Sequence, residues 1–371
     1  MKFTVNVFRN EDLSYPIYIG KDILQALVEE IKVLLPSSLV VVTDNIVKHF
    51  HMDLLVKYLD TLLIPYHVIS VPSGEKHKNR KTKEIIENEM LRLKIDRKAL
   101  IIAFGGGVVG DIAGFVAATY HRGISYIQLP TTLLAMVDSS IGGKTGVDTP
   151  YGKNTIGAFY QPKAVIMELR FLDTLPCVHF KNGLVEVLKH SIIRDKNFYN
   201  FLRANHESIM SRDEEVLERT IEWSCRIKKE IVESDEREEG LRKILNFGHT
   251  VGHAIEAVSN YKILHGFAVS AGMVVESFIS TRLGLLSEED CISIVELLKL
   301  FSLPTTFKEL GLKLSQKDFY RIVELMKGDK KSISKEIKIS LPTEIGKMVD
   351  SFTVDVEPSI IIQTLSDVSN L

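Results

Sequence analysis

Three stretches of the chain carry side chains that could hold a metal ion. Glu186 and Lys189 lie three residues apart and would share one helix face, and His265 precedes a glycine. Between them, the segment LNFGHTVGHAIE contains a polar stripe at helical spacing, formed by Asn246, His249, Thr250 and His253. Such a stripe is costly to bury unless its members are bonded, and one glutamate with two histidines forms a sound catalytic zinc set. Spacing alone pairs His249 with His253, although the glutamate of an HExxH motif is absent.

A glycine-rich turn could bind the phosphates of a dinucleotide. The string ALIIAFGGGVVGD places Gly105, Gly107 and Gly110 as GxGxxG between an expected strand and an expected helix. Glycines let backbone amides approach a pyrophosphate there, and the helix N-terminus favours its negative charge. The turn does not follow the first strand, and the acid best placed for ribose hydroxyls is Asp44, upstream in LVVVTD. A tight strand–helix turn without a ligand is the alternative.

Cationic side chains gather in two further regions. The string SSIGGKTG fails as a phosphate-binding GxxxxGK[ST] loop, because Asp138 stands where its first glycine would be. Lys144 then joins Lys153 and Asn154 of YGKNTIG on expected loops, where the cations either bind an anion or are merely solvated. Upstream of the histidines lie Lys228, Glu238 and Arg242. If a helix begins near Arg242, the polar stripe and these charges project into one cleft, which suits an acidic, oxygen-rich substrate.

Composition excludes several function classes. The 371 residues are 45% hydrophobic and 25% charged, which is ordinary for a folded globular protein. The net charge of −2 offers no basic excess for nucleic acid or a membrane surface, and no apolar run approaches the roughly 20 residues that span a bilayer. The N-terminus shows no secretory signal, and the three cysteines are far apart. We therefore expect a cytoplasmic protein without nucleic-acid or membrane partners.

Hydrophobic periodicity predicts two domains. Up to about residue 170, short β-branched runs alternate with helical stretches, which predicts an α/β domain (1–172) with a largely parallel, Rossmann-like sheet. Its expected strands are Phe3–Phe8, Pro16–Ile19, Leu39–Thr43, Tyr66–Val71, Ala99–Phe104, Tyr126–Leu129 and Val165–Leu169, and its expected helices Asp22–Leu35, Asn45–Leu59 and Lys81–Leu93. Residues 173–371 are expected to form an all-α domain with helices at Gly183–Ile193, Asp213–Glu233, Asn246–Val258, Ala268–Leu283, Glu288–Leu300 and Lys317–Met326. The boundary predicts a cleft between the domains.

The sequence resembles the 3-dehydroquinate synthases of the sugar-phosphate cyclase superfamily along nearly its whole length. The resemblance rests on GGGVVGDIAGFVAA, RGISYIQLPTTLLAMVDSSIGGKTGV, GKNTIGAF, LDTLP, DEREEGLRKILNFGHTVGHAIE and DKKS. It implies an NAD-binding α/β domain on a helical domain, and zinc ligands at Glu186, His249 and His265. His253 then becomes a substrate contact instead of a ligand. Asp148, Glu168 and Phe267 depart from the common family pattern, although none is a matched ligand.

The resemblance also implies the remaining contacts. The NAD contacts are Asp44, Glu75, Lys78, Gly106, Gly107, Val108, Asp111, Thr131, Thr132, Ser139, Lys144 and Lys153. The substrate and catalytic positions are Asp138, Lys144, Lys153, Asn154, Lys189, Lys228, Glu238, Arg242, Asn246 and His253. Arg122 would reach the neighbouring active site of a homodimer, and Lys330 or Lys331 would close over the ligand.

The implied reaction converts 3-deoxy-D-arabino-heptulosonate 7-phosphate to 3-dehydroquinate and phosphate. Transient oxidation at C5 by NAD acidifies the C6 proton, phosphate leaves, the hydride returns, and an intramolecular aldol closes the ring. A divalent ion, zinc or cobalt, would polarise the C5 alcohol. Arg242 with Lys228 would hold the substrate carboxylate, and Lys144, Asn154, His253 and Arg122 its phosphate. The alternatives are another sugar-phosphate cyclase, a metal-dependent polyol dehydrogenase and a non-catalytic NAD-binding scaffold.

Overall fold

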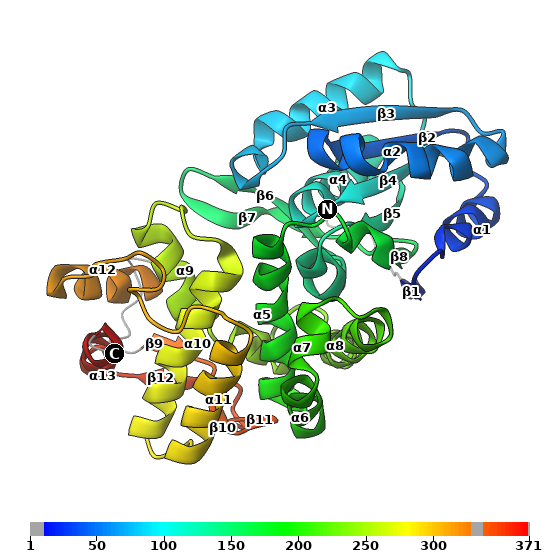
Figure 1. The fold of residues 1–371 in the computed structure, drawn as a ribbon. Helices are drawn as coiled ribbons and strands as arrows, with labels where there is room; N and C mark the ends of the chain where they lie inside the picture. The colour runs from blue at the N-terminus through cyan, green and yellow to red at the C-terminus, as the bar shows by residue number, and fades with distance from the viewer. Residues whose placement is uncertain (1–10, 328–336, 370–371) are drawn as a thin grey trace, which may run out of the picture. The chain divides into compact units, whose positions relative to one another are not determined.

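The computed structural model describes residues 11–327 and 337–369 (Figure 1). The expected strand Phe3–Phe8 and the lysines Lys330 and Lys331 lie outside the described residues. The chain forms two compact units. The first comprises the described residues up to 18, with 23–129 and 143–167; the second comprises 19–22, 130–142 and the described residues from 168 onward. Residues 130–142 thus pack with the second unit, although they precede the expected boundary near residue 172.

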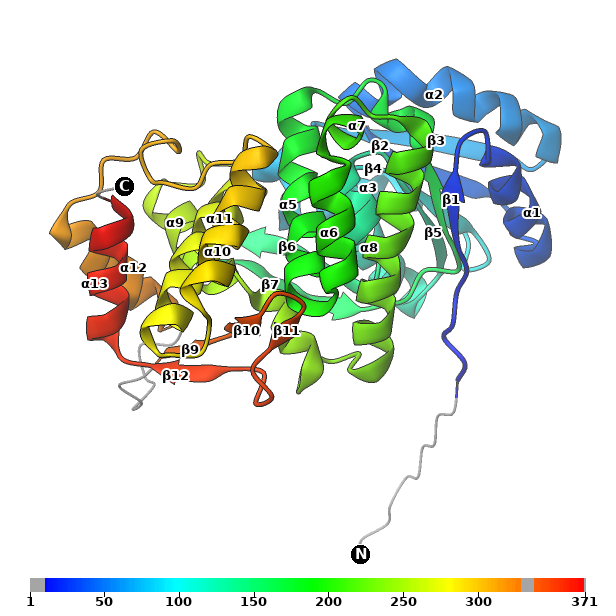
Figure 2. The same cartoon turned by 60° about the horizontal axis from the view of Figure 1, so that its bottom comes forward.

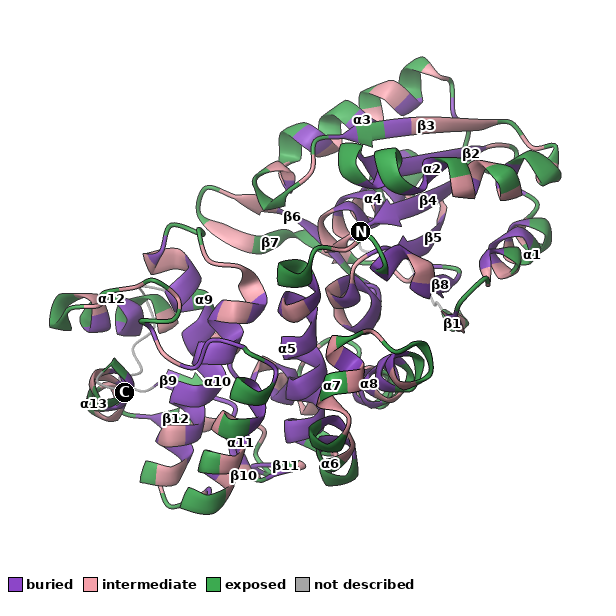
Figure 3. Ribbon diagram, viewed as in Figure 1, coloured by how far each residue is buried: buried purple, intermediate pink, exposed green. Residues whose placement is uncertain are grey.

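A six-stranded sheet, in the order β1-β8-β5-β4-β2-β3, organises the first unit. The strands are β1 (Ile17–Gly20), β2 (Leu39–Asp44), β3 (Tyr66–Val71), β4 (Leu100–Gly105), β5 (Ser125–Pro130) and β8 (Val165–Glu168). Strand β2 pairs in parallel with β3 and β4, and β5 pairs in parallel with β8. Every residue of β2 and β4 is buried, which explains their continuous apolar runs (Figure 3). The predicted parallel sheet is confirmed.

The helices of the first unit begin where the sequence offers caps. They are α1 (Leu24–Leu34), α2 (Asn45–Leu59), α3 (Arg80–Arg92) and α4 (Gly107–Thr119). The Asp44 carboxylate accepts from the amides of Ile46 and Val47 at the start of α2, and Asn79 accepts from Thr82 at the start of α3. Asp44 therefore has a structural task besides the NAD contact that the resemblance implies.

Lys144, Lys153 and Asn154 lie on a β-hairpin, so the prediction of loops there is wrong. Strands β6 (Lys144–Thr149) and β7 (Gly152–Phe159) pair antiparallel. The close pairing depends on glycine, because a Cβ on Gly157 would lie 1.9 Å from the Thr145 carbonyl oxygen. The Thr145 side chain in turn packs against Gly114 of α4. Glycines and lysines suggested loops in these segments. The close contacts of Gly157 and Gly114 with Thr145 instead make the glycines part of a packed hairpin.

The second unit is mainly helical, as predicted. Its helices are α5 (Cys177–Arg194), α6 (Lys196–Ala204), α7 (His206–Met210), α8 (Glu214–Ser234), α9 (His249–Val258), α10 (His265–Arg282), α11 (Glu288–Leu300), α12 (Gln316–Met326) and α13 (Pro358–Ser369). Helices α5, α6 and α8 lie side by side (Figure 2), and α5 and α10 are buried along most of their length (Figure 3).

Two short antiparallel pairs add to the helices: β9 (Ile337–Ile339) with β12 (Val354–Val356), and β10 (Pro342–Glu344) with β11 (Lys347–Met348). They modify the expectation of an all-α domain. Within residues 11–327 and 337–369, no helix combines the length and apolarity that crossing a bilayer requires.

Candidate active site

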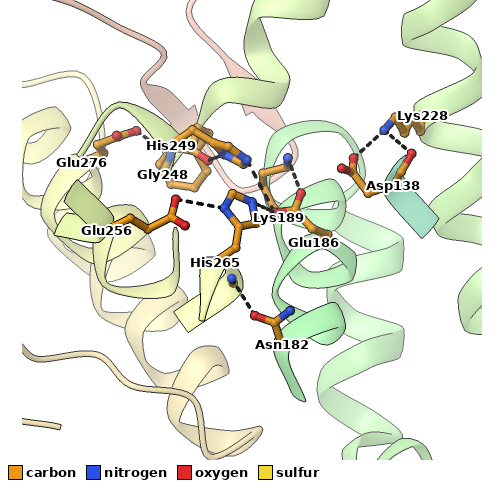
Figure 4. A network of polar contacts seen from close by, with 12 residues as sticks. Asp138, Asn182, Glu186, Lys189, Lys228, Gly248, His249, Glu256, His265 and Glu276 are labelled. Carbon is orange, nitrogen blue, oxygen red and sulfur yellow. Dashed lines mark hydrogen bonds and ion pairs between the residues drawn. The ribbon is translucent and has the colours of Figure 1, made fainter. Parts of the chain in front are cut away.

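Glu186 and two histidines face one another within the second unit (Figure 4). Glu186 lies in the middle of α5, whereas His249 and His265 are the first residues of α9 and α10. The Nε2 atoms of His249 and His265 lie 3.6 Å and 3.9 Å from Glu186 Oε1. Ligand atoms around a tetrahedral zinc ion lie about 3.3 Å apart. Glu186 Oε1 therefore faces both histidines at slightly more than this spacing.

The surroundings of Glu186 also fit a cation. Its side chain is fully buried, and neither carboxylate oxygen accepts a hydrogen bond from the described residues. Oε2 makes an ion pair with Lys189 one helical turn away, whereas Oε1 faces the histidines. A buried carboxylate oxygen without a donor is costly unless a cation approaches it. The prediction that Glu186 and Lys189 share one helix face agrees with this contact.

Each histidine ring is held by its second nitrogen. Nδ1 of His249 lies 3.2 Å from the Phe247 carbonyl oxygen, and Nδ1 of His265 lies 3.2 Å from Glu256 Oε2. Such contacts fix the tautomer that leaves Nε2 available to a metal. Burial, with Lys189 nearby, lowers the pKa of His249 well below its ordinary value, which keeps the ring neutral. Burial also acts to lower the pKa of His265, but Glu256 raises it above its ordinary value.

His253 lies beside this set. Its ring centroid is 5.3 Å from that of His249 and 5.7 Å from that of His265, and nitrogens of the three rings lie within 4.8 Å of one another. His253 is exposed, however, whereas Glu186 is completely buried. The burial of Glu186 agrees with the ligand set implied by the family resemblance, whereas the grouping of the three rings agrees with the His249–His253 pair suggested by spacing.

The polar stripe does not lie on one helix, so that prediction is wrong. Helix α9 begins at His249, and Asn246 ends a separate 3₁₀ segment, η6 (Leu241–Asn246). Gly248 between them has φ of +80°, which favours glycine. Its carbonyl oxygen packs so close to α10 that a Cβ on Gly272 would lie 2.0 Å from it. Because the chain turns at Gly248, no continuous helix joins Asn246 to His249, and the helical spacing expected for the stripe is lost.

Arg242 and Asn246 have partners of their own in this unit. The Arg242 guanidinium, almost entirely buried, donates to the Gly142 carbonyl oxygen at 3.2 Å and to the Glu236 carbonyl oxygen. Asn246 donates from Nδ2 to Glu238 Oε1 at 2.6 Å. Two of the predicted substrate residues, Glu238 and Asn246, are therefore brought together.

Asp138 and Lys228 form a second charged pair in this unit. Asp138 belongs to a short π-helical segment, η4 (Ala135–Ser139), and Lys228 to α8. Lys228 Nζ lies 2.5 Å from both Asp138 Oδ1 and the Asp138 carbonyl oxygen. Although burial opposes it, the ammonium groups of Lys228 and Lys189 hold the pKa of Asp138 far below its usual range. Burial lowers the pKa of Lys228 despite Asp138.

Three of the predicted NAD contacts, Thr131, Thr132 and Ser139, lie in the second unit instead of the first. The segment that carries them packs closely on α5, because a Cβ on Gly183 would lie 2.5 Å from the Leu134 amide nitrogen. Thr132 Oγ1 accepts from the Ala135 amide at 3.2 Å. The buried Thr131 Oγ1 has no hydrogen-bond partner among the described residues.

Four of the remaining predicted NAD contacts, Glu75, Lys78, Asp111 and Lys153, form a charged cluster in the first unit. The buried Lys78 ammonium pairs with Asp111 of α4 and donates to Asn154 Oδ1 at 2.5 Å. Burial lowers the pKa of Lys78, but Asp111 and Glu75 outweigh it and raise the value above normal. Lys153 lies 3.5 Å from Glu75, so all these side chains are near each other.

The glycine-rich turn lies between strand β4 and helix α4, as predicted. Gly106 is the N-cap and Gly107 the first residue of α4, and no side chain caps this helix, which is the kind of N-terminus that binds anions. A Cβ on Gly110 would lie 2.8 Å from Gln128 Oε1, which explains the third glycine by packing. Lys144 and Arg122 are exposed within this unit.

Comparison with known proteins assigns the family. Residues 68–182 match the 3-dehydroquinate synthase N-terminal model, and residues 183–332 match the 3-dehydroquinate synthase C-terminal model. A 3-dehydroquinate synthase of Dictyoglomus turgidum is 43% identical over 362 residues, covering 96% of each chain. That of a Sulfurovum strain is 44% identical over 334 residues, covering 89% of this chain and 90% of its own. The chain belongs to the 3-dehydroquinate synthase family. The family and the synthase activity predicted from the sequence are confirmed.

Solved structures place the 3-dehydroquinate synthase fold among related cyclases. A 2-epi-5-epi-valiolone synthase of Streptomyces hygroscopicus, solved with NAD⁺ and Zn²⁺ bound, is 25% identical with a TM-score of 0.87 and covers 99% of both chains. A 2-deoxy-scyllo-inosose synthase complexed with carbaglucose-6-phosphate, NAD⁺ and Co²⁺ is 26% identical with a TM-score of 0.86. It covers 95% of this chain and 96% of its own.

Sequence reasoning missed several polar side chains around the 3-dehydroquinate synthase site. His190 is fully buried, and its Nδ1 lies 2.7 Å from Ser224 Oγ. Asn182 Oδ1 accepts from the Gly266 amide at 2.8 Å, directly after the ligand candidate His265. His190 stands one residue after Lys189, and Glu256 three residues after His253, so polar residues inside apolar helices were the available signal.

Proposed function

We propose that the chain converts 3-deoxy-D-arabino-heptulosonate 7-phosphate to 3-dehydroquinate and phosphate, with NAD and a divalent ion. The observation that carries this proposal is the buried Glu186 oxygen facing the Nε2 atoms of His249 and His265, in a chain of this family. When bound, the ion supplies Lewis-acid polarisation of a substrate hydroxyl, and NAD supplies the reversible hydride acceptance that permits elimination. The predicted cofactors agree with those of the solved cyclases.

Cationic residues of the second unit bind the substrate carboxylate in this proposal. The Arg242 guanidinium is held in place by the Gly142 and Glu236 carbonyl oxygens, which pre-orients a fork suited to a carboxylate. Lys228 adds a buried positive charge, already oriented by Asp138. Lys144, Asn154, His253 and Arg122 are assigned to the phosphate.

The substrate's own phosphate removes the C6 proton in this proposal. Two candidate carboxylates of the second unit already have partners: Asp138 is paired with Lys228, and Glu238 accepts from Asn246. The low pKa of Asp138, caused by Lys228 and Lys189 against the effect of burial, makes it a poor base. A phosphonate analogue that still exchanged its C6 proton at the normal rate after losing its dianionic form would contradict this assignment.

The proposal assigns Lys78, Asp111 and the Gly106–Gly107 turn to NAD, together with Thr131, Thr132 and Ser139. Residues 1–172 are proposed as the NAD-binding α/β domain, and residues 173–371 as the helical metal- and substrate-binding domain.

We further propose a cytoplasmic homodimer in which Arg122 reaches the neighbouring active site. Cys177, Cys225 and Cys291 are all unbridged, in keeping with a reducing compartment. Sedimentation of the purified protein, and rescue of activity when R122A and K228A subunits are mixed, test the shared site. A monomer with full activity would contradict it.

Phosphate release from the heptulosonate phosphate tests the activity. We expect release that requires a divalent ion, stops with a chelator, and leaves no net NADH. Stoichiometric NADH would indicate a polyol dehydrogenase instead. The fold shared with other cyclases makes a different sugar phosphate the second candidate, so sedoheptulose 7-phosphate and glucose 6-phosphate serve as rival substrates. The identity of 43–44% to the synthases, against 25–26% to those cyclases, favours the heptulosonate.

A further inference from the structure

Glu256, a residue outside the ligand and substrate sets, contacts one of the metal-binding histidines. It lies near the end of α9, and only 1% of it is exposed. Its Oε2 atom lies 3.2 Å from His265 Nδ1 (Figure 4). The backbone of Glu256 is also fixed, because its carbonyl oxygen accepts from Ser259 Oγ and from the Tyr261 amide. The carboxylate is thus held from the helix that begins with His249.

The two histidines are supported by different chemistry. His249 faces a neutral backbone carbonyl, that of Phe247, whereas His265 faces a buried carboxylate. A carboxylate that accepts the Nδ1 proton makes an imidazole a stronger donor at Nε2 and restricts its rotation. His265 has greater need of such support, because its side chain is 28% exposed against 13% for His249.

This inference rests on the proposed metal site. We propose that Glu256 is a positioning residue that accepts a hydrogen bond from His265 Nδ1 and directs Nε2 toward Glu186. It thereby links α9 with α10 through the ligand itself. Glu186 by direct contact and Glu256 through the ring together bring two negative charges to a divalent ion. Such outer contacts change metal affinity by about 10–100-fold when they are removed.

Metal affinity of E256Q tests the proposal. The substitution keeps the length of the side chain and an oxygen acceptor but removes the charge. Dissociation constants for Zn²⁺ and Co²⁺ are measured by competition with a chromophoric chelator, and the visible absorption of the Co²⁺ form reports ligand geometry. We expect affinity about 10–100-fold weaker, an altered Co²⁺ spectrum, and a kcat that recovers at saturating metal. A purely structural role would lower the melting temperature of the metal-free protein without these changes.

A matched control is E309Q. The Glu309 carboxylate also lies in the second unit, but it accepts from the amides of Thr305 and Thr306, at 2.7 Å and 3.1 Å. We expect E309Q to bind both metals like the wild type. Equal metal affinity and equal spectra for E256Q and wild type would overturn the proposal. If the wild type itself bound no metal, the proposed function would fail instead, so the two failures are distinguishable.

The wild-type protein offers a second measurement should E256Q fold poorly. Nitrogen-15 NMR of the Zn²⁺-loaded protein reports which nitrogen of His265 carries the proton. The proposal requires a protonated Nδ1 whose proton exchanges slowly with water. A deprotonated Nδ1, or one whose proton exchanges as fast as that of a solvent-exposed ring, would overturn it.

Discussion

Two charged clusters, one in each unit, satisfy their buried groups in opposite ways. The Lys78 ammonium pairs with the Asp111 carboxylate and donates to the Asn154 side-chain oxygen, so the two opposite charges are already neutralised. Around Glu186, a carboxylate oxygen faces two imidazole nitrogens whose other nitrogens are already engaged. The first arrangement stabilises the fold by itself, whereas in the second Lys189 pairs with one Glu186 oxygen and the other gains a cationic partner only when an ion binds. Removing a side chain should therefore affect stability in one unit and metal affinity in the other.

The largest effect is expected from Glu186. E186Q removes the negative charge of the ligand side chain but keeps its size. We expect metal content near zero and activity lower by at least about a thousandfold. Atomic absorption and phosphate release measure both. H253A is the control, because His253 is assigned to the substrate: it should keep the metal while losing activity. Loss of metal in H253A with retention in E186Q would restore the histidine pair indicated by spacing.

The next effect concerns Lys78. K78A removes the buried ammonium that pairs with Asp111, and we expect the first unit to lose about 2–4 kcal/mol of stability. Urea unfolding of the metal-free protein measures this. K153A is the control, because its longer contact with Glu75 is more exposed and should contribute under about 1 kcal/mol. If K78A unfolded like the wild type, the contrast between the clusters would not hold.

A third effect, gradual with pH, should arise from Glu276. This fully buried carboxyl of α10 accepts from the amides of Gly248 and Val251, and burial raises its pKa to about 8. The unfolded chain releases that proton near the ordinary value of 4.5, so between pH 4.5 and 8 the folded state binds more protons. Stability should therefore fall as pH rises through this window, by at most about 1.4 kcal/mol per pH unit.

Urea unfolding of metal-free protein from pH 5 to 9 measures that slope. E276Q cannot ionise and should flatten it, whereas E309Q should keep the wild-type slope. An E276Q slope equal to that of the wild type would assign the pH dependence to other groups.

The smallest effect is expected at Asp148, one of the departures from the family pattern that the sequence resemblance indicated. Asp148 Oδ1 accepts from the Asn154 amide at 2.8 Å, and an asparagine oxygen can accept the same bond. D148N should therefore change the free energy of unfolding by no more than about 0.5 kcal/mol. It should also leave the Michaelis constant nearly unchanged. D148A, which removes the acceptor, should raise the Michaelis constant more. Equal effects of the two variants would show that this hydrogen bond does not position Asn154.

How far the sequence predicts this molecule depends on whether a feature is local. Strand β2 and helix α2 follow from a continuous apolar run and from the Asp44 cap, both visible in the sequence. The β6–β7 hairpin depends on contacts between Gly157 and Thr145, and the start of α9 on the approach of Gly248 to Gly272, which periodicity does not report. The ligand set came from the family resemblance, whereas Glu256 became visible only through its distance from His265.

Three different helices contribute Glu186, His249 and His265, and two of these helices begin with the ligand itself. An ion on these atoms would cross-link α5, α9 and α10 at positions far apart along the chain, so its binding energy would also oppose unfolding of this unit. Catalytic competence and resistance to proteolysis should then decline together as the ion is withdrawn. Scarcity of the metal would thus limit the lifetime of the protein as well as its turnover.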